Sequence, residues 1–139
     1  MRKQKNLIKI PEIFDDCFLY FAQNPDHIPF KIKRVYYILK SDPRFTRGYH
    51  AHKSTDQALF CIQGSVGLIL DNGKSRKRLE LNHPGEGILI NKMIWHEMYD
   101  FKGNTILLVL SSKVFKPEDY IRDYEEYLKL IHGKRRGKV

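Results

Sequence analysis

Between Phe30 and Ser111 the sequence is a series of short β-branched or aromatic runs separated by turn residues. The runs recur about every ten residues, and proline, glycine and Asp-Asn-Gly mark the breaks between them. Regular short strands with such turns are typical of an antiparallel sandwich or barrel. Asp71-Asn72-Gly73 predicts a tight hairpin, because a type I′ turn needs positive φ at both central residues. We therefore expect an all-β domain.

The segment after these strands has helical spacing instead. Pro117 and two acidic residues stand at the expected start of a helix, and Gly133 stands at its expected end. The apolar side chains that recur at helical spacing between them are Tyr120, Ile121, Tyr124, Leu128 and Ile131. We expect a short C-terminal helix that packs on the strands.

Length and charge limit the classes of partner. A chain of 139 residues fits one domain, so we expect 1–139 to form a single domain, with basic ends at 1–9 and 132–139. Each end contributes +4 of the net charge of +9, which leaves +1 for residues 10–131. A folded nucleic-acid binder usually carries a basic face, and this nearly neutral body predicts none. We expect no nucleic-acid partner.

Apolar runs and cysteines indicate the compartment. The longest aliphatic run, Ile106 to Leu110, is far shorter than the ~20 residues that a membrane-spanning helix needs. The charged first residues contain no apolar stretch long enough for a signal peptide. Cys17 and Cys61 are too few for a disulfide framework or a zinc knuckle. We expect a cytoplasmic protein with no membrane partner.

The stretch "RGYHAHK" places two histidines at positions i and i+2. On a strand, His50 and His52 would face the same side. The unperturbed pKa of imidazole, about 6.5, lets one ring act as a base and its neighbour as an acid near neutral pH. The same pair could hold a metal or lie on an ordinary surface, so the spacing alone leaves three alternatives.

The wider spacing resembles the two motifs of the cupin superfamily. That resemblance implies an all-β double-stranded β-helix, or jelly roll, in which His50, His52, Gln57 and His96 occupy the positions of the metal ligands. Metal-binding cupins have a glutamate where this chain has Gln57, and an amide offers a cation only a dipole where a carboxylate offers a charge. A cation site is therefore weakened, and we predict no metal and no cofactor.

A narrower resemblance covers most of the chain. The stretches "IPFKIKRVYYIL", "RGYHAHK", "WHEMYDF", "VLSS" and "EDYIRDYEEY", between about Ile28 and Tyr127, are similar to the sugar 3,4-ketoisomerases that act on dTDP-4-keto-6-deoxyglucose. This family implies a metal-free homodimer in the pathways to 3-amino-3,6-dideoxy sugars. It also implies that a base takes the C3 proton, which is acidic because it is α to the C4 carbonyl, and that the enediol is reprotonated at C4. The resemblance assigns this proton transfer to His50 and His52, without saying which is the base.

The remaining candidate residues would bind the dTDP-linked sugar. Arg47 matches the family's arginine in the histidine motif, and Arg34 is a second candidate for the pyrophosphate, whose oxygens match the fork of guanidinium donors. The other candidate substrate-binding residues are Tyr36, Tyr37, Gln57, Trp95 and His96. We expect the aromatic residues to stack on thymine or sugar, Gln57 to hydrogen-bond in the pocket, and His96 to lie across the barrel from the histidine pair.

One segment departs from the family pattern. Family members often have an Asp-x-Arg-Gly turn near the N-terminus, where this chain has Asp15, Asp16, Cys17 and Phe18. The stereochemistry of the product at C4 is therefore open between galacto and gluco. We favour galacto, because a histidine and not an arginine follows Trp95. Three other hypotheses also remain: a metal-dependent cupin enzyme, a non-catalytic sugar-binding cupin and a 3,5-epimerase.

Overall fold

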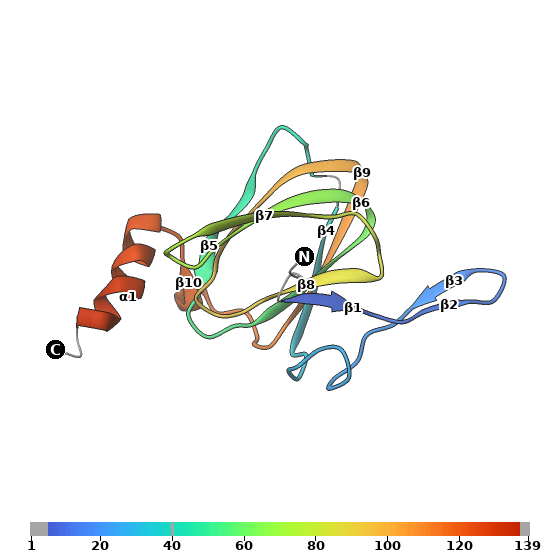
Figure 1. Ribbon diagram of the computed structural model, residues 1–139, viewed down its shortest axis with the longest axis horizontal. Helices are drawn as coiled ribbons and strands as arrows, with labels where there is room; N and C mark the ends of the chain where they lie inside the picture. Colours follow the sequence, from blue (N-terminus) through green and yellow to red (C-terminus); the bar gives the residue numbers. More distant parts are fainter. Residues whose placement is uncertain (1–5, 40, 137–139) are drawn as a thin grey trace.

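The computed structural model describes residues 6–39 and 41–136. Most strands belong to one barrel, and a single helix follows them in the described chain (Figure 1). The strands are β1 (Leu7–Lys9), β2 (Glu12–Phe14), β3 (Phe18–Tyr20), β4 (Arg34–Leu39), β5 (Arg47–His52), β6 (Gln57–Asp71), β7 (Arg76–Leu81), β8 (Glu86–Ile90), β9 (Trp95–Ser111) and β10 (Tyr120–Ile121), and the helix is α1 (Tyr124–Arg136). The predicted all-β fold with a short C-terminal helix is confirmed. Residues 1–5 and 137–139 of the predicted basic ends lie outside the described residues.

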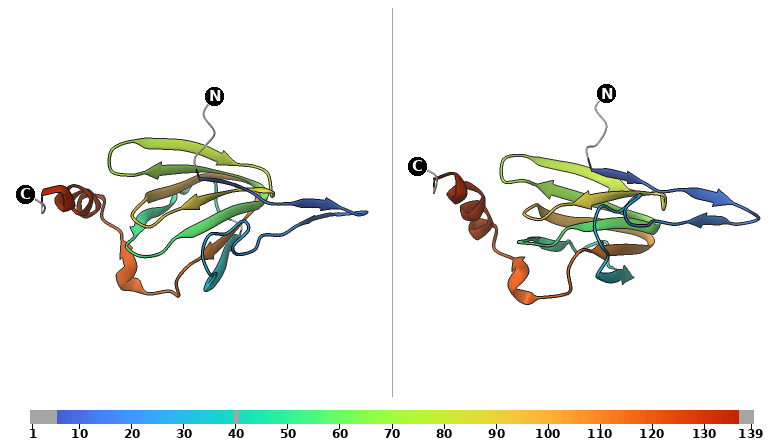
Figure 2. Two further views of the ribbon diagram at one scale, coloured as in Figure 1. Left: turned by 60° about the horizontal axis from the view of Figure 1, so that its bottom comes forward. Right: turned by 90° about the horizontal axis from the view of Figure 1, so that it is seen from below.

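Two long strands form the framework of the barrel. β6 and β9 run antiparallel, from the pair Gln57–Ser111 to the pair Asp71–Trp95. The first part of β6 pairs with β8 and its last part with β7, while β9 pairs with β5 near its start and with β4 near its end. Each long strand therefore belongs to two sheets, which is the jelly-roll arrangement visible in Figure 2.

The bend of these strands needs glycine. The ladder between β6 and β9 shifts register three times between Cys61 and Gly67, and Gly64 there has a φ of +75°. A Cβ on Gly64 would lie 2.1 Å from the carbonyl oxygen of Lys102. Such bulges strengthen the local bend and twist, and they let a strand turn from one sheet into the next.

The interior of the barrel is filled by apolar side chains from the long strands and their neighbours. Its buried members are Leu59, Cys61, Val66, Leu68, Leu70, Leu81, Ile88, Ile90, Met98, Phe101, Leu107 and Val109. Tyr36 and Ile38 of β4 pack against this cluster. The core therefore supports the strands β4, β5 and β9 from inside, and it fixes the directions in which their alternate side chains point.

The C-terminal segment differs from the sequence prediction. The helix was expected to begin near Pro117, but Pro117–Asp119 forms a single 3-10 turn, and Tyr120–Ile121 pairs with β5 as strand β10. The helix begins only at Tyr124, and it continues past Gly133 to Arg136. Both predicted ends were therefore wrong. The start moved because pairing with a distant strand overrides the helical spacing of Tyr120. The expected packing is observed, since Tyr124 and Tyr127 lie against Trp95.

The predicted hairpin at Asp71 joins β6 to β7, but its turn is longer than expected. Residues 72–75 connect the two strands, and only Gly73, with a φ of +90°, has the predicted positive φ. The side chain of Asn72 accepts hydrogen bonds from the backbone N–H groups of Lys74 and Ser75. A side-chain-capped loop thus replaces the two-residue type I′ turn.

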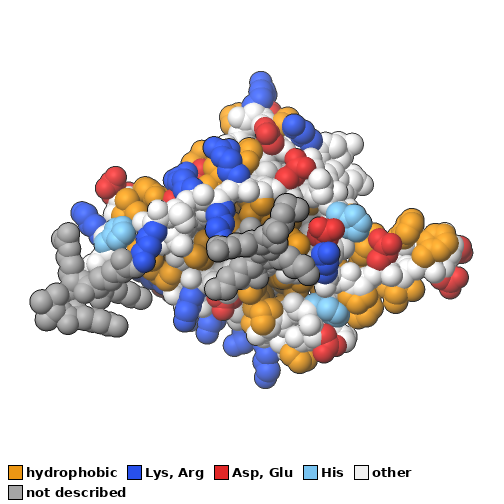
Figure 3. Space-filling view, viewed as in Figure 1, with side chains coloured by type: hydrophobic (Ala, Val, Ile, Leu, Met, Phe, Trp, Pro, Cys, Tyr) orange, Lys and Arg blue, Asp and Glu red, His pale blue; other side chains and the backbone are white. Residues whose placement is uncertain are grey.

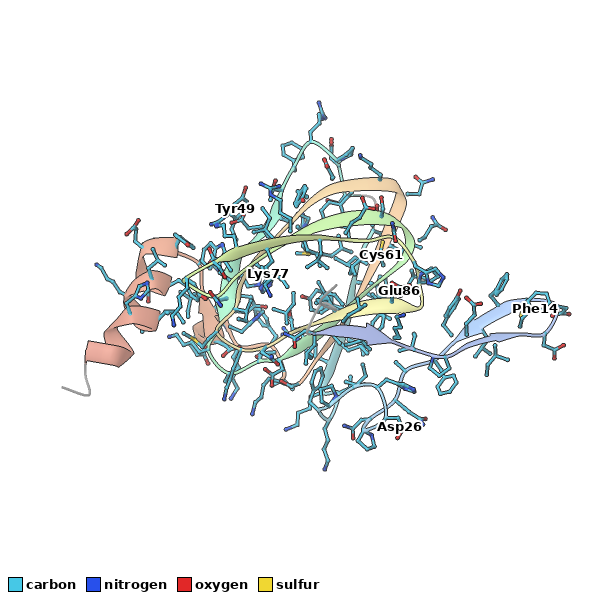
Figure 4. The ribbon with its side chains drawn as sticks, in the orientation of Figure 1. Phe14, Asp26, Tyr49, Cys61, Lys77 and Glu86 are labelled. Carbon is cyan, nitrogen blue, oxygen red and sulfur yellow. The ribbon has the colours of Figure 1, made fainter. Side chains whose placement is uncertain are left out.

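The N-terminal segment forms a hairpin that extends away from the barrel, on the side opposite to α1 (Figure 1). β2 and β3 pair with each other and with no other described strand. Figure 3 shows apolar side chains gathered along this hairpin, and Phe14, labelled in Figure 4, is 66% exposed. The turn holds Asp15, Asp16 and Cys17. These residues, where the family pattern has an arginine, therefore lie away from the barrel of their own chain.

Within the described residues, α1 is too short and too polar to cross a lipid bilayer.

Candidate active site

Three histidines meet on two neighbouring strands. His50 and His52 stand on one face of β5 as expected, and His50 lies directly opposite His96 of β9. The ring centroid of His50 lies 4.8 Å from that of His52 and 4.5 Å from that of His96. The prediction that His96 lies across the barrel was wrong, because β9 is the direct partner of β5. All three imidazoles therefore form one cluster.

A β-bulge in β5 aims His50 at this cluster. The register passes from Gly48–Glu97 to His50–His96, which leaves Tyr49 as an extra residue on β5. Gly48 has a φ of +94°, and a Cβ there would lie 2.9 Å from the carbonyl oxygen of His96. Tyr49, labelled in Figure 4, is 48% exposed. The glycine of "RGYHAHK" is thus required by the bulge, which re-orients the side chain that follows it.

Backbone carbonyls define the protonation of two of the rings. Nδ1 of His50 lies 3.0 Å from the carbonyl oxygen of Gly48, and Nδ1 of His96 lies 3.1 Å from that of Ile94. Since a carbonyl only accepts, Nδ1 carries the proton in each neutral ring and Nε2 keeps a lone pair. Nε2 of His50 and of His52 is buried with no hydrogen-bond partner among the described residues. These nitrogens are available to a substrate.

Burial keeps the histidines neutral. Desolvation, reinforced by the positive charge that a neighbouring histidine would carry, lowers the pKa of His52 to about 4 and that of His96 to about 3. Desolvation also lowers the pKa of His50, although the hydrogen bond to the Gly48 carbonyl opposes it. At neutral pH all three rings are therefore uncharged, which is the state a proton acceptor needs.

A cavity of about 390 Å³ opens in front of His50. Its lining residues are Arg34, Tyr36, Ile38, Arg47, Gly48, His50, Met98, Phe115, Tyr120 and Arg122. Among the described residues, three guanidinium groups and no carboxylate line this space. The Arg34 guanidinium lies 5.5 Å from the ring centre of Tyr36, and its Nε has no hydrogen-bond partner among the described residues. Such a cavity favours an anionic ligand.

Most of the predicted site residues line the cavity or adjoin the residues that line it. Arg34, Tyr36, Arg47 and His50 line the cavity, and His52 and His96 adjoin His50. Gln57 supports the cavity from behind, since its Nε2 donates to the Tyr36 hydroxyl at 3.3 Å and to Ser111 Oγ at 3.0 Å. The amide thus holds a side chain that lines the cavity.

The structure does not bring Tyr37 and Trp95 to the cavity. Tyr37 follows Tyr36 on β4, so it points to the opposite face, where it is 63% exposed. Trp95 precedes His96 on β9, and it is buried against α1 with its indole N–H donating to the Glu97 carboxylate at 2.9 Å. Strand alternation therefore separates each of these aromatic residues from the candidate beside it.

Two residues of the site, Tyr120 and Arg122, were not predicted from the sequence. The Tyr120 ring centroid lies 4.9 Å from that of His50 and 4.6 Å from that of His52. The Arg122 guanidinium lies 4.4 Å from the Tyr120 ring centre. The expected C-terminal helix would make Tyr120 a packing residue on its apolar face. Its order of tyrosine, buried isoleucine and arginine is also the alternation of a strand, and that signal was present in the sequence.

The three histidines are also the candidate ligands for a metal. One ligand atom from each of His50, His52 and His96 lies within 4.8 Å of the others. Three imidazoles form a known type of zinc site. The fourth motif position, Gln57, hydrogen-bonds to Tyr36 and Ser111 and brings no charge. That this protein works without a metal stays a prediction.

Comparison with known proteins relates the site to one family. A family model described as FdtA: WxcM-like, C-terminal, matches residues 3–132. The chain is 42% identical over 129 residues to a TDP-4-oxo-6-deoxy-alpha-D-glucose-3,4-oxoisomerase of Aneurinibacillus thermoaerophilus, covering 92% of this chain and 93% of the relative.

Two solved structures are similar over nearly the whole chain. QdtA, a sugar 3,4-ketoisomerase of Thermoanaerobacterium thermosaccharolyticum in complex with TDP, is 43% identical with a TM-score of 0.89, over 92% of this chain and 94% of that one. A histidine-to-asparagine variant of QdtA was solved in complex with TDP-4-keto-6-deoxyglucose. It is 41% identical with a TM-score of 0.89, over 94% of this chain and 97% of that one.

Proposed function

This chain belongs to the FdtA family of WxcM-like, C-terminal sequences, and on that premise we propose that it is a sugar 3,4-ketoisomerase acting on TDP-4-keto-6-deoxyglucose. It is an isomerase that converts the 4-keto sugar into the TDP-3-keto-6-deoxyhexose. The observation that carries this assignment is a pair of unpartnered histidine nitrogens beside an arginine-lined cavity. The relatives that share the fold at 41–43% identity are named for this reaction or were solved with its substrate or TDP.

The proposed mechanism removes a proton from C3 and delivers one to the adjacent carbon, C4. The neutral imidazole of one member of the pair His50 and His52 takes the proton from C3, and the C–H electrons form the C3–C4 double bond of an enediol as O4 takes a proton from the solvent. The O3 hydroxyl then returns a proton to the solvent, and C4 is reprotonated from an imidazolium on the same face. The electrons balance within the sugar, so no oxidant or reductant is required.

Two physical features support this chemistry. The low pKa of the buried rings keeps them unprotonated before the substrate binds. The cavity arginines Arg34, Arg47 and Arg122 supply positive charge, which would bind the pyrophosphate and stabilise the negative charge that develops on the enediol oxygens. Tyr36, held by Gln57, would contact the sugar.

We infer that C4 of the product has the galacto configuration. A histidine and not an arginine follows Trp95, and the ring of this residue, His96, lies 4.5 Å from that of His50. A small neutral ring at this point leaves room on one face of C4, so that the proton arrives from the histidine side. The coupling between H4 and H5 in the product distinguishes the alternatives, since an axial H4 of a gluco sugar gives a large coupling and an equatorial H4 a small one.

We also propose a cytoplasmic homodimer. Alternate side chains of β4 form an exposed apolar row, with Val35 56%, Tyr37 63% and Leu39 50% exposed. Contiguous apolar surface of this kind is typical of an interface. The two cysteines are both free, which agrees with a reducing compartment.

The assignment is tested by adding the purified protein to TDP-4-keto-6-deoxyglucose and following the ¹H NMR spectrum, with and without EDTA. We expect 3-keto sugar signals to appear at the same rate in both samples. Turnover abolished by EDTA and restored by a metal would favour the metal-dependent alternative. Binding of TDP, measured by calorimetry, without any turnover would favour the non-catalytic alternative.

A further inference from the structure

His52 is held differently from the other two histidines. The Nδ1 atoms of His50 and His96 each face a backbone carbonyl, at 3.0 Å and 3.1 Å. For His52, which is only 2% exposed, Nε2 is buried with no hydrogen-bond partner among the described residues. The rings of His50, His96 and Tyr120 lie around it, so packing contributes to the orientation of this ring.

One of the rings that pack on His52, that of Tyr120, comes from a strand of only two residues. Tyr120 of β10 pairs with His52 of β5, and the two ring centroids lie 4.6 Å apart in an edge-on arrangement. Two residues of pairing contribute few backbone hydrogen bonds, and short isolated strands are weakly stable. The position of the Tyr120 ring depends on what fastens β10 to β5.

Asp119 is that fastening. Its carboxylate accepts hydrogen bonds from the Ser54 N–H at 2.8 Å, from Ser54 Oγ at 2.7 Å and from Thr55 Oγ1. Its carbonyl oxygen accepts the Lys53 N–H at 2.9 Å. The four bonds join the residue before Tyr120 to the three residues after His52. Both ends of the His52–Tyr120 contact are thus tied to one residue.

Asp119 also places a negative charge near His52, whose pKa is lowered by burial and by the neighbouring His50, Arg34 and Arg122. Burial raises the pKa of its carboxyl, but the hydrogen bonds from Thr55 and Ser54 outweigh this and lower that pKa, so the group is ionised at neutral pH. The charged and titratable groups that act on His52 or contact it are His50, His96, Tyr120, Arg34, Arg122 and Asp119. Asp119 is the one carboxylate among them. Its charge favours the protonated form of His52, which the others disfavour or leave unchanged.

We propose that Asp119 is a positioning residue for His52: it fixes the Tyr120 ring against the imidazole and places a negative charge where the imidazolium forms during turnover. This inference rests on the proposed function, because it names a residue that acts through one of the proposed proton-transfer groups. Asp119 does not line the cavity that holds the arginines, so it does not contact the substrate directly. The loss of its charge alone should therefore affect the proton-transfer step and leave nucleotide binding unchanged.

Two substitutions separate the charge from the hydrogen bonds. Asp119→Asn keeps an oxygen that accepts from Ser54 but removes the charge, and Asp119→Ala removes both. We expect kcat to fall roughly tenfold for Asp119→Asn, because the imidazolium loses a stabilising negative charge, and about 100-fold for Asp119→Ala, as loss of positioning implies. The matched control is Glu118→Gln, which removes the same charge from an exposed neighbour for which no hydrogen bond or ion pair is found among the described residues. We expect it to behave as the wild type.

Three readouts decide the proposal. The affinity for TDP should stay within about twofold in Asp119→Asn, since this variant keeps an oxygen that fastens the segment of Tyr120 and Arg122. The acidic limb of the pH–kcat profile should move to lower pH in Asp119→Asn, because removal of a negative charge lowers the pKa of His52. The ¹⁵N NMR titration of the His52 ring reports the same shift without requiring turnover.

A wild-type kcat, an unmoved acidic limb and an unmoved ¹⁵N titration in Asp119→Asn would overturn the proposal. So would equal losses of kcat, TDP affinity and melting temperature in both variants, because that pattern belongs to a purely structural residue. If the wild-type protein itself turns over no substrate, the proposed function fails. The ¹⁵N titration would then still decide whether Asp119 acts on His52.

Discussion

The two sides of the candidate site are built in different ways. The histidines belong to the β5–β9 pair, in which β9 is part of the long ladder that also carries the core. Tyr120 and Arg122 belong to a short segment that pairs antiparallel with the end of β5, and hydrogen bonds to the Asp119 carboxylate hold this segment in place. The groups proposed for chemistry thus lie on the rigid framework, and part of the proposed binding surface lies on an attached segment. Loss of a histidine from the framework should affect kcat, and loss of a cavity guanidinium from the segment should affect binding.

The largest effect is expected for the histidine pair. Replacing His50 or His52 with asparagine keeps a polar side chain of similar size but removes the base. We expect kcat to fall by about 10²–10⁴-fold, the usual contribution of a general acid–base group, while TDP affinity changes little. Steady-state kinetics and calorimetry on the same preparations measure both. A variant of either residue with more than a tenth of the wild-type kcat would remove it from the proton-transfer step.

The next largest effect is expected on TDP binding, from a substitution on the attached segment. Arg122→Gln removes one cavity guanidinium from the attached segment. We expect the Kd for TDP to rise about tenfold, as loss of a charge-assisted hydrogen bond implies, and kcat to change less than the Kd. Lys129→Gln, on the exposed face of α1, removes the same charge away from the cavity and serves as the control. Equal effects of the two variants would show that only net charge matters.

A third prediction concerns pH and stability. The folded-state pKa of His96 is about 3, well below the unfolded value near 6.5. The unfolded chain therefore binds more protons in this range, so stability is complete above about pH 6.5 and is lost as the pH falls toward 3. His96 alone should cost about 2 kcal/mol between pH 7 and pH 5. Urea unfolding at the two pH values measures this difference. We expect His96→Gln to reduce it, and an equal pH dependence in that variant would show that other groups cause it.

The smallest effect on catalysis is expected for Tyr37. Tyr37→Ser changes the exposed face of β4 and leaves Tyr36 and the cavity in place. We expect kcat within about twofold of the wild type, together with a weaker dimer in light scattering over a dilution series. A large loss of kcat in a variant that stays dimeric would place Tyr37 in the site after all.

The sequence predicts the framework better than the attached segment, for a physical reason. The alternation of a strand is local, so it correctly placed His50 and His52 on one face. The same alternation separates Tyr37 from the cavity, although Tyr36 and Tyr37 were both predicted to bind the substrate. The pairing of β9 with β5 joins residues far apart in the chain, and no local pattern reveals that His96 lies beside His50. Tyr120 shows the same limit, because its helical spacing is real but pairing with His52 prevails.

The measurement that tests the account most directly is the position of deuterium after turnover in D₂O. The wild-type protein, with EDTA present, is mixed with TDP-4-keto-6-deoxyglucose, and the product is examined by ¹H NMR and mass spectrometry. The account predicts a 3-keto product with deuterium at C4, a small H4–H5 coupling in the matching H₂O sample, and no such product from His50→Asn. Deuterium at C5, or unchanged turnover by His50→Asn and His52→Asn alike, would contradict proton transfer between C3 and C4 by the histidine pair.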